Sequence, residues 1–153
     1  MAKISLKING KKITKEIADN TMLSDFVRDN LALTGTHIGC DTSQCGACVV
    51  HLNGNSVKSC TTLVADCDGG EITTIEGLAS NGKMHPMQEA FKKHHGLQCG
   101  FCTPGMVMSA VDLLQKNKNP SEQEIRDWLE GNICRCTGYQ GIVAAVKDAA
   151  SKM

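Results

Sequence analysis

Large aromatic side chains are scarce in this chain, which has one Trp, one Tyr and three Phe among 153 residues. One small domain or two smaller lobes with so few large side chains would be only marginally stable on packing alone. Bound metal could supply the missing cross-links, because metal-binding free energy adds to folding free energy. Charge bias is also absent, with 16 basic and 16 acidic residues. This balance argues against nucleic-acid binding, which rests on a basic surface.

Long apolar runs are absent as well. No run approaches the ~20 apolar residues of a membrane-spanning helix, and residues 1–10 lack the apolar region of a signal peptide. We therefore expect a soluble, cytoplasmic chain without a transmembrane segment. Thiols stay reduced in the cytoplasm, so clustered cysteines there indicate metal rather than disulfides.

Cysteine, in contrast, is abundant, and eight of the nine cysteines form two quartets. The first quartet is Cys40-x4-Cys45-x2-Cys48 completed by Cys60, and the second is Cys99-x2-Cys102 completed by Cys134-x-Cys136. The first spacing is that of a plant-type [2Fe–2S] site, held by four thiolates. Zinc sites usually pair two short Cys-x2–4-Cys units instead. The second spacing favours iron–sulfur over zinc but leaves both open.

The first half of the chain has the periodicity of a small sheet. Alternating apolar residues and two Asn-Gly pairs predict two hairpins. The expected elements are strands at 4–8 and 13–17, a helix at 22–31, a loop at 34–48, strands at 49–52 and 57–60, and a strand at 72–75. This order predicts an α+β fold that begins with a ferredoxin-like sheet, with the cysteine loop between its helix and its second hairpin.

The second half has helical periodicity after an irregular linker at 77–83. Thr103 is predicted to be the N-cap of a helix with Pro104 at its first position, and Ser121 with Glu124 matches a capping box. The expected helices cover 86–91, 103–114, 121–129 and 142–150. We expect a small helical bundle that encloses the second cysteine quartet.

Several other residues invite a functional interpretation. Cys67 is the ninth cysteine, outside both quartets, and we expect it to be a spare thiol rather than a metal ligand. His37 could tune or replace a cluster ligand, but four thiolates are already present, which favours ordinary packing or hydrogen bonding. Arg135, between two predicted ligands, could raise a cluster potential, contact a partner or form a surface ion pair. Trp128 is expected to pack in the bundle. No arrangement of residues predicts a catalytic site.

Four motifs carry a family resemblance. They are Gly39-Cys-Asp-Thr-Ser-Gln-Cys-Gly-Ala-Cys48, Thr73-Thr-Ile-Glu-Gly77, Gln98-Cys-Gly-Phe-Cys-Thr-Pro-Gly105 and Gly131-Asn-Ile-Cys-Arg-Cys-Thr-Gly-Tyr139. Together they resemble the iron–sulfur subunit of the molybdenum hydroxylases, the xanthine oxidase family, over nearly the whole chain. Within that family, the aerobic carbon monoxide dehydrogenase small subunit is the nearest resemblance.

The resemblance implies a plant-type [2Fe–2S] ferredoxin (β-grasp) domain at 1–77 and a four-helix-bundle [2Fe–2S]-binding domain at 78–153. It implies that the first quartet holds the cluster nearer the flavin and the second quartet the cluster nearer the molybdenum. Gln98 and Cys136 would contact the pterin cofactor. The implied partners are a large molybdenum-pterin subunit and a medium FAD subunit, in a dimer of heterotrimers that could lie at the inner face of the membrane.

The function that follows is electron transfer within an oxidoreductase complex, from the molybdenum site through two clusters to FAD. Carbon monoxide is the expected substrate of the complex, with an aldehyde, a purine or an N-heterocycle as the alternative. Substrate chemistry would take place on a partner chain. A zinc-stabilised binding module is the alternative from a different functional class.

Overall fold

The computed structural model describes residues 1–153, and its sheet is built from two tight hairpins. Asn9-Gly10 and Asn53-Gly54 form the turns, and all four residues have positive φ, between 48° and 82°. Two-residue hairpin turns favour Asn-Gly because both positions need positive φ. Both predicted hairpins are therefore confirmed. The strands are β1 (Ala2–Ile8), β2 (Lys11–Ile17), β3 (Val49–Leu52), β4 (Asn55–Lys58) and β5 (Glu71–Thr73).

The five strands form one mixed sheet in the order β2-β1-β5-β3-β4. β5 enters the centre parallel to β1 and antiparallel to β3, which joins the two hairpins. Helix α1 (Leu23–Asp25) continues as a π-helical turn at Phe26–Asn30 and packs on the sheet, where Phe26 and Val27 are fully buried. The predicted helix at 22–31 is thus one helical segment with a widened second half.

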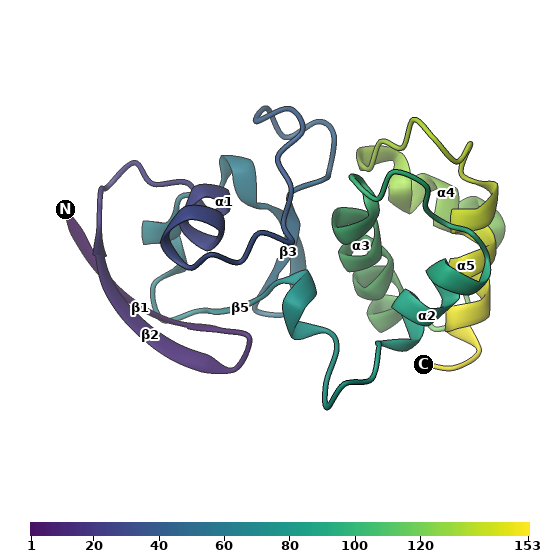
Figure 1. Ribbon diagram of the computed structural model, residues 1–153, viewed down its shortest axis with the longest axis horizontal. Coiled ribbons are helices and arrows are strands. Elements are labelled where there is room, and N and C mark those ends of the chain that lie inside the picture. Colours follow the sequence, from purple (N-terminus) through teal and green to yellow (C-terminus); the bar gives the residue numbers. More distant parts are fainter.

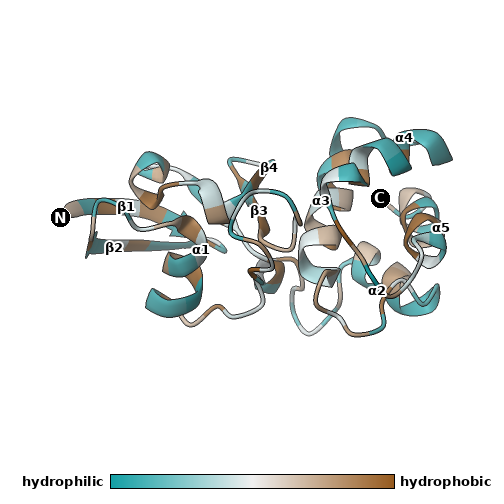
Figure 2. Ribbon diagram, turned by 90° about the horizontal axis from the view of Figure 1, so that it is seen from above, coloured by the Kyte–Doolittle hydropathy of each residue, from teal (hydrophilic) through white to brown (hydrophobic).

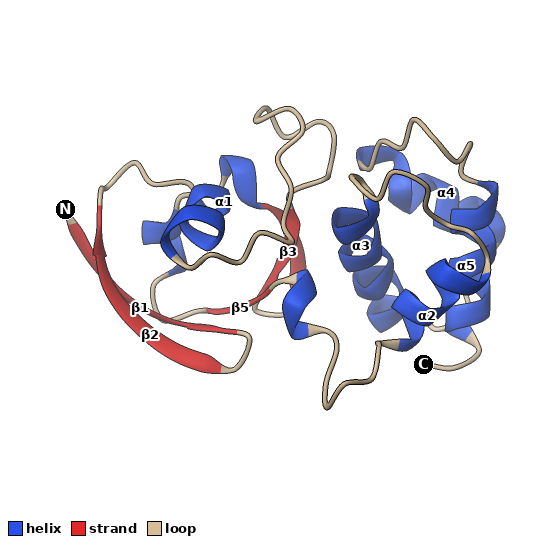
Figure 3. Ribbon diagram, in the orientation of Figure 1, coloured by secondary structure: helices blue, strands red, loops and turns tan.

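The second part of the molecule contains four α-helices beside the sheet (Figures 1 and 3). They are α2 (Pro86–Lys93), α3 (Thr103–Lys116), α4 (Glu122–Trp128) and α5 (Gln140–Ala150). Ser121 and Glu124 form the predicted capping box at the start of α4. Figure 2 shows that α4 is largely hydrophilic whereas β3 is hydrophobic, as expected for an outer helix and an inner strand. The α+β fold class, a ferredoxin-like sheet followed by a helical bundle, is confirmed.

Two details of the helical part differ from the prediction. Cys102, not Thr103, occupies the N-cap of α3, so Thr103 is the first helical residue. Trp128 lies at the edge of the bundle and is 38% exposed. Its indole N–H donates to the carbonyl of Ser109 at 2.9 Å, and the Lys116 ammonium lies 5.1 Å from its ring centre. The polar end of the ring thus finds a backbone partner while one face stays in solvent.

Helix α3 lies at the boundary between the sheet and the bundle, against β3 (Figure 1). The buried His51 ring on β3 is 2.7 Å from the carbonyl of Met108 through Nε2. Close to the helix start, a Cβ added at Gly105 would lie 2.1 Å from the carbonyl oxygen of Gly46, so glycine is needed for this approach. The two halves therefore meet through direct backbone contact. No helix is long and apolar enough to cross a membrane.

Candidate metal centres

The first quartet gathers around the loop that precedes β3. Backbone amides of Thr42, Gln44 and Cys45 point at the Cys40 sulfur, with N···S distances of 3.4, 3.4 and 3.3 Å. These hydrogen bonds, that of Cys45 first, lower the pKa of Cys40 to about 6. The loop therefore favours a thiolate at neutral pH, which is the form that binds metal.

The other members of this quartet lie deeper. Cys48 and Cys60 are both buried. Cys60 lies in a 3₁₀ turn just after β4 rather than at the end of the strand. Burial, followed by the proximity of Cys48 and Cys40, raises the pKa of Cys60 to about 11. A buried thiol of this kind needs a cation as partner before it ionises readily.

Cys45, the remaining member of the first quartet, is the one that faces the second quartet. Its sulfur packs against Gly39, where an added Cβ would approach it to 2.9 Å, and it also lines the cavity of the second quartet. The loop therefore needs glycine at position 39 to make room for the sulfur.

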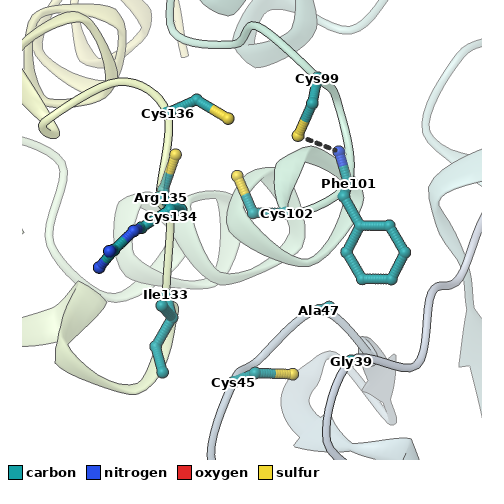
Figure 4. Close-up of a pocket in the computed structure, with 10 residues that line it drawn as sticks. All are labelled: Gly39, Cys45, Ala47, Cys99, Phe101, Cys102, Ile133, Cys134, Arg135 and Cys136. Carbon is teal, nitrogen blue, oxygen red and sulfur yellow. Dashed lines mark hydrogen bonds between the residues drawn. The ribbon is translucent and has the colours of Figure 1, made fainter.

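The second quartet surrounds a cavity of about 240 Å³ at one end of the bundle. Figure 4 shows the sulfurs of its four cysteines directed toward one another across this cavity, with Cys45 on a separate wall. Cys102 stands at the start of α3, whereas Cys134 and Cys136 come from the loop that leads into α5. The structure thus brings together all four residues predicted for the second site.

The four cysteines of the second quartet differ in their surroundings. Burial raises the pKa of Cys102 to about 12, whereas the amide of Phe101, 3.5 Å from the sulfur, contributes most to lowering the pKa of Cys99. Four thiolates around one cavity are what the two iron atoms of one [2Fe–2S] cluster require. They come from two segments that are far apart in the sequence.

The loop around Cys134 is held by its own side chains. The Tyr139 hydroxyl accepts a hydrogen bond from the Cys134 amide at 2.8 Å and donates to the Asn132 carbonyl at 3.0 Å. The Thr137 hydroxyl lies 3.1 Å from the Cys134 sulfur. Burial alone would raise the pKa of Cys134, but hydrogen bonds led by Thr137 outweigh it and leave the pKa lowered. The roles of Thr137 and Tyr139 are not visible in the cysteine spacing.

One hydrogen bond connects the two quartets directly. The amide of Ile133, next to Cys134, donates to the carbonyl of Cys45 at 2.8 Å. Beside it, the Asn132 side chain donates to the carbonyl of Gly46 at 3.2 Å, and the two atoms are buried. The loops that carry the two quartets are therefore joined through backbone, which sequence spacing could not have shown.

The rim of the second cavity is exposed and apolar. Phe101 and Ile133, which line it, are 48% and 55% exposed, respectively. The Gln98 side chain donates to the carbonyl of Cys136, another residue of the lining, at 3.1 Å. The two residues expected to contact a pterin are therefore hydrogen-bonded neighbours.

The three other candidate residues of the sequence analysis lie outside the two sets of ligands. Cys67 is buried in the core of the sheet half, outside both quartets. His37 stacks on the Phe101 ring at 4.8 Å, and its Nδ1 is 2.7 Å from the Phe101 carbonyl, so it packs between the two halves. Arg135 forms no ion pair within the chain, and Figure 4 shows its side chain directed away from the sulfurs. None of the three is a fifth ligand.

The donor sets fit binuclear clusters. No group of three or more His, Cys, Asp or Glu side chains has the spacing for a single metal ion. The second quartet instead surrounds a cavity with its four sulfurs directed toward one another (Figure 4). Amide and hydroxyl groups also point at the sulfurs, as is usual around iron–sulfur clusters.

Both halves of the chain match known domain families. Residues 6–80 match the 2Fe-2S iron-sulfur cluster binding domain, and residues 74–147 match the [2Fe-2S] binding domain. The two matches together span both quartets.

Whole-chain relatives agree with these matches. The chain is 47% identical to the nicotine 6-hydroxylase small subunit of Paenarthrobacter nicotinovorans, over 98% of this chain and 90% of that protein. Among solved structures, quinoline 2-oxidoreductase from Pseudomonas putida 86 superposes with a TM-score of 0.95 at 41% identity, covering 98% of this chain and 94% of the other. Aldehyde oxidoreductase from Desulfovibrio gigas superposes with a TM-score of 0.94 at 44% identity, covering 99% of this chain but 17% of that longer chain.

Proposed function

This chain belongs to the family of small iron–sulfur subunits of molybdenum hydroxylases, and we propose that it relays single electrons from a molybdenum-pterin chain through two [2Fe–2S] clusters to FAD on another chain. A bound [2Fe–2S] cluster supplies one-electron redox chemistry. The chain's own residues hold the clusters, donate hydrogen bonds to the ligand sulfurs and fix the distance between the two sites.

The observation that carries this proposal is the direct connection between the quartets. The Cys45 carbonyl accepts a hydrogen bond from the Ile133 amide at 2.8 Å, and Ile133 precedes Cys134. One hydrogen bond and two short stretches of backbone therefore separate a ligand of one cluster from a ligand of the other. Electron transfer through protein weakens steeply with distance and is favoured by bonded paths. A structural metal module would have no need for such a link.

We assign the first cluster to Cys40, Cys45, Cys48 and Cys60, and the second to Cys99, Cys102, Cys134 and Cys136. The second cluster would be nearer molybdenum, because the exposed apolar residues Phe101 and Ile133 line its cavity and need a partner surface. Gln98 and Cys136, at that rim, would contact the pterin. The exposed polar loop 41–44 would face the FAD chain. We place the boundary between the two cluster-binding domains at residues 77 and 78.

For the complex as a whole, we favour a nitrogen heterocycle as substrate, with an aldehyde as the second candidate. The named relatives act on nicotine, quinoline and aldehyde, and none of these names indicates the carbon monoxide expected from the sequence. The substrate is selected on the molybdenum chain, so the substrate must be identified by testing several candidate electron donors on the intact complex. Complex isolated through this subunit should reduce a dye with an N-heterocycle. Dye reduction with carbon monoxide, and with no other donor, would instead support carbon monoxide as the substrate.

The relay itself is tested by single cysteine variants of the intact complex. Cys136→Ser should prevent electrons from reaching either cluster after substrate addition. Cys45→Ser should leave the second cluster reducible and block reduction of FAD. Cys67→Ser is the matched control, because Cys67 lies outside both quartets, and it should behave like the unmodified complex.

Three results would contradict the proposal. Unchanged FAD reduction in Cys45→Ser would reject the order of the clusters. Unchanged cluster reduction in Cys136→Ser would reject its place next to the pterin. A colourless chain that contains zinc and no iron or labile sulfide would reject the electron-transfer function and favour a zinc-stabilised binding module.

We also propose that the complex is a dimer of heterotrimers, each with this chain, a large molybdenum-pterin chain and a medium FAD chain. Native mass spectrometry of complex isolated through this subunit should give two copies of each chain. A stable complex that lacks either larger chain would contradict this composition.

A further inference from the structure

The sulfur of Cys134 has a hydroxyl neighbour with a fixed orientation. Thr137 Oγ1 lies 3.1 Å from Cys134 Sγ, and the amide of Tyr139 donates to the same oxygen at 3.2 Å. The oxygen therefore accepts from Tyr139, which leaves its own hydrogen available for the sulfur. A ligand thiolate carries no hydrogen, so the Thr137 hydroxyl must be the donor when a cluster is bound.

The orientation of this hydroxyl is built into the loop. Tyr139 has a left-handed backbone, with φ of 68°, directly after Gly138 with φ of 62°. This turn brings the Tyr139 amide back to Thr137 and its phenol back to the Cys134 amide, 2.8 Å away. A left-handed conformation is costly for a tyrosine and persists only where the surroundings enforce it. The loop thus holds the donor in place before any cluster binds.

A second threonine follows the neighbouring ligand directly. Thr103 comes straight after Cys102, but its buried Oγ1 has no hydrogen-bond partner. Thr137 is therefore the threonine whose hydroxyl lies within hydrogen-bond distance of a sulfur of the second quartet.

We propose that Thr137 is a positioning residue that raises the reduction potential of the second cluster by donating a hydroxyl hydrogen bond to a ligand sulfur. This inference rests on the proposed function. One-electron reduction makes the cluster and its sulfurs more negative, so a donor stabilises the reduced form more than the oxidised form. A higher potential would favour entry of the electron from the molybdenum side. No bond is formed or broken, and the added electron stays on the cluster.

The test is a redox titration of the intact complex with dithionite as the electron donor, followed by electron paramagnetic resonance. Thr137→Val keeps the shape of the side chain and removes the donor. We expect the second cluster to become about tenfold harder to reduce, equal to about 59 mV for a one-electron couple. Thr137→Ser should restore the potential. The first cluster should be unchanged, as should both clusters in Thr14→Val, where a distant exposed hydroxyl bonds only Ser5.

An unshifted second cluster in Thr137→Val, or an equal shift of both clusters, would overturn the inference. If Thr137→Val does not assemble the second cluster, Thr137→Ala provides the same measurement with a smaller side chain. Loss of the cluster in both variants, with retention in Thr137→Ser, would show that the hydroxyl only builds the loop, and would also overturn it. Absence of both cluster signals from the unmodified complex would instead reject the proposed function.

Discussion

Asp112 links the helical half of the molecule to the sheet, and its removal should loosen this boundary. Its carboxylate, on α3, is 3% exposed. It accepts hydrogen bonds from the Ser56 amide of β4 at 3.1 Å and from the Ser56 hydroxyl, and it pairs with Lys116 at 2.9 Å. Burial would raise the pKa of Asp112, but the bonds from Ser56 and Lys116 outweigh it and leave the pKa lowered.

The change Asp112→Ala removes a charged acceptor and leaves the Ser56 amide without its partner. Hydrogen bonds to charged groups contribute about 1.5–3 kcal/mol each, and breaking one side of a buried pair costs about 3–5 kcal/mol. We expect a local loss of at least about 2 kcal/mol, which is about 30-fold in the opening equilibrium. Hydrogen exchange of the Ser56 amide in the cluster-containing chain should therefore accelerate by about that factor.

The matched control is Asp148→Ala. Asp148 also has several side-chain partners, but they are the ammonium groups of Lys93 and Lys152 and the ring Nε2 of His94, all within the helical half. Exchange at Ser56 should be unchanged in this variant. Equal acceleration in both variants, or none in Asp112→Ala, would show that the boundary does not depend on this carboxylate.

Gly105, Asp148 and Cys60 allow three further tests. Gly105→Ala should cost about 1–3 kcal/mol in unfolding free energy, because its Cβ would meet the Gly46 carbonyl. The control Gly131→Ala should cost less, because its Cβ would meet only the flexible end of a lysine. Equal midpoints of urea unfolding for the two variants would contradict this. Asp148, whose pKa is lowered to about 2 mainly by Lys152, should stabilise the chain above pH ~4 and lose this effect as pH falls through about 2. The difference in Tm between the unmodified chain and Asp148→Asn should shrink over that range, and a difference that grows on acidification would refute it. Cys60→Ser should lower iron from about four atoms per chain to about two and remove one cluster signal; loss of both signals would mean that the two sites do not assemble independently.

The local parts of the fold could be predicted from the sequence because their causes are local. Asn9-Gly10 and Asn53-Gly54 form hairpin turns since Asn and Gly tolerate positive φ. The capping box at Ser121 likewise depends on residues three apart. The cap of α3 lies one residue earlier than predicted, since Cys102 holds the N-cap and Thr103 is the first helical residue, with Pro104 still in the first turn.

Contacts between distant segments could not be predicted in the same way. The spacing of the cysteines indicated two sites, but not that Cys45 of the first quartet lines the cavity of the second. Nor did it indicate the bond from Ile133 to Cys45, which depends on how α3 packs against the sheet. Burial of Cys67 in the sheet core is another consequence of tertiary packing, and the local sequence does not indicate it.

The most direct test of the account is electron paramagnetic resonance of the intact complex, frozen after reduction by its own substrate. We predict two distinct [2Fe–2S] signals, each integrating to about one spin per copy of this chain, because each reduced cluster takes up one electron. Both signals should form no later than reduced FAD. Reduction of FAD by substrate while either cluster is absent would contradict an electron path through the two cysteine quartets.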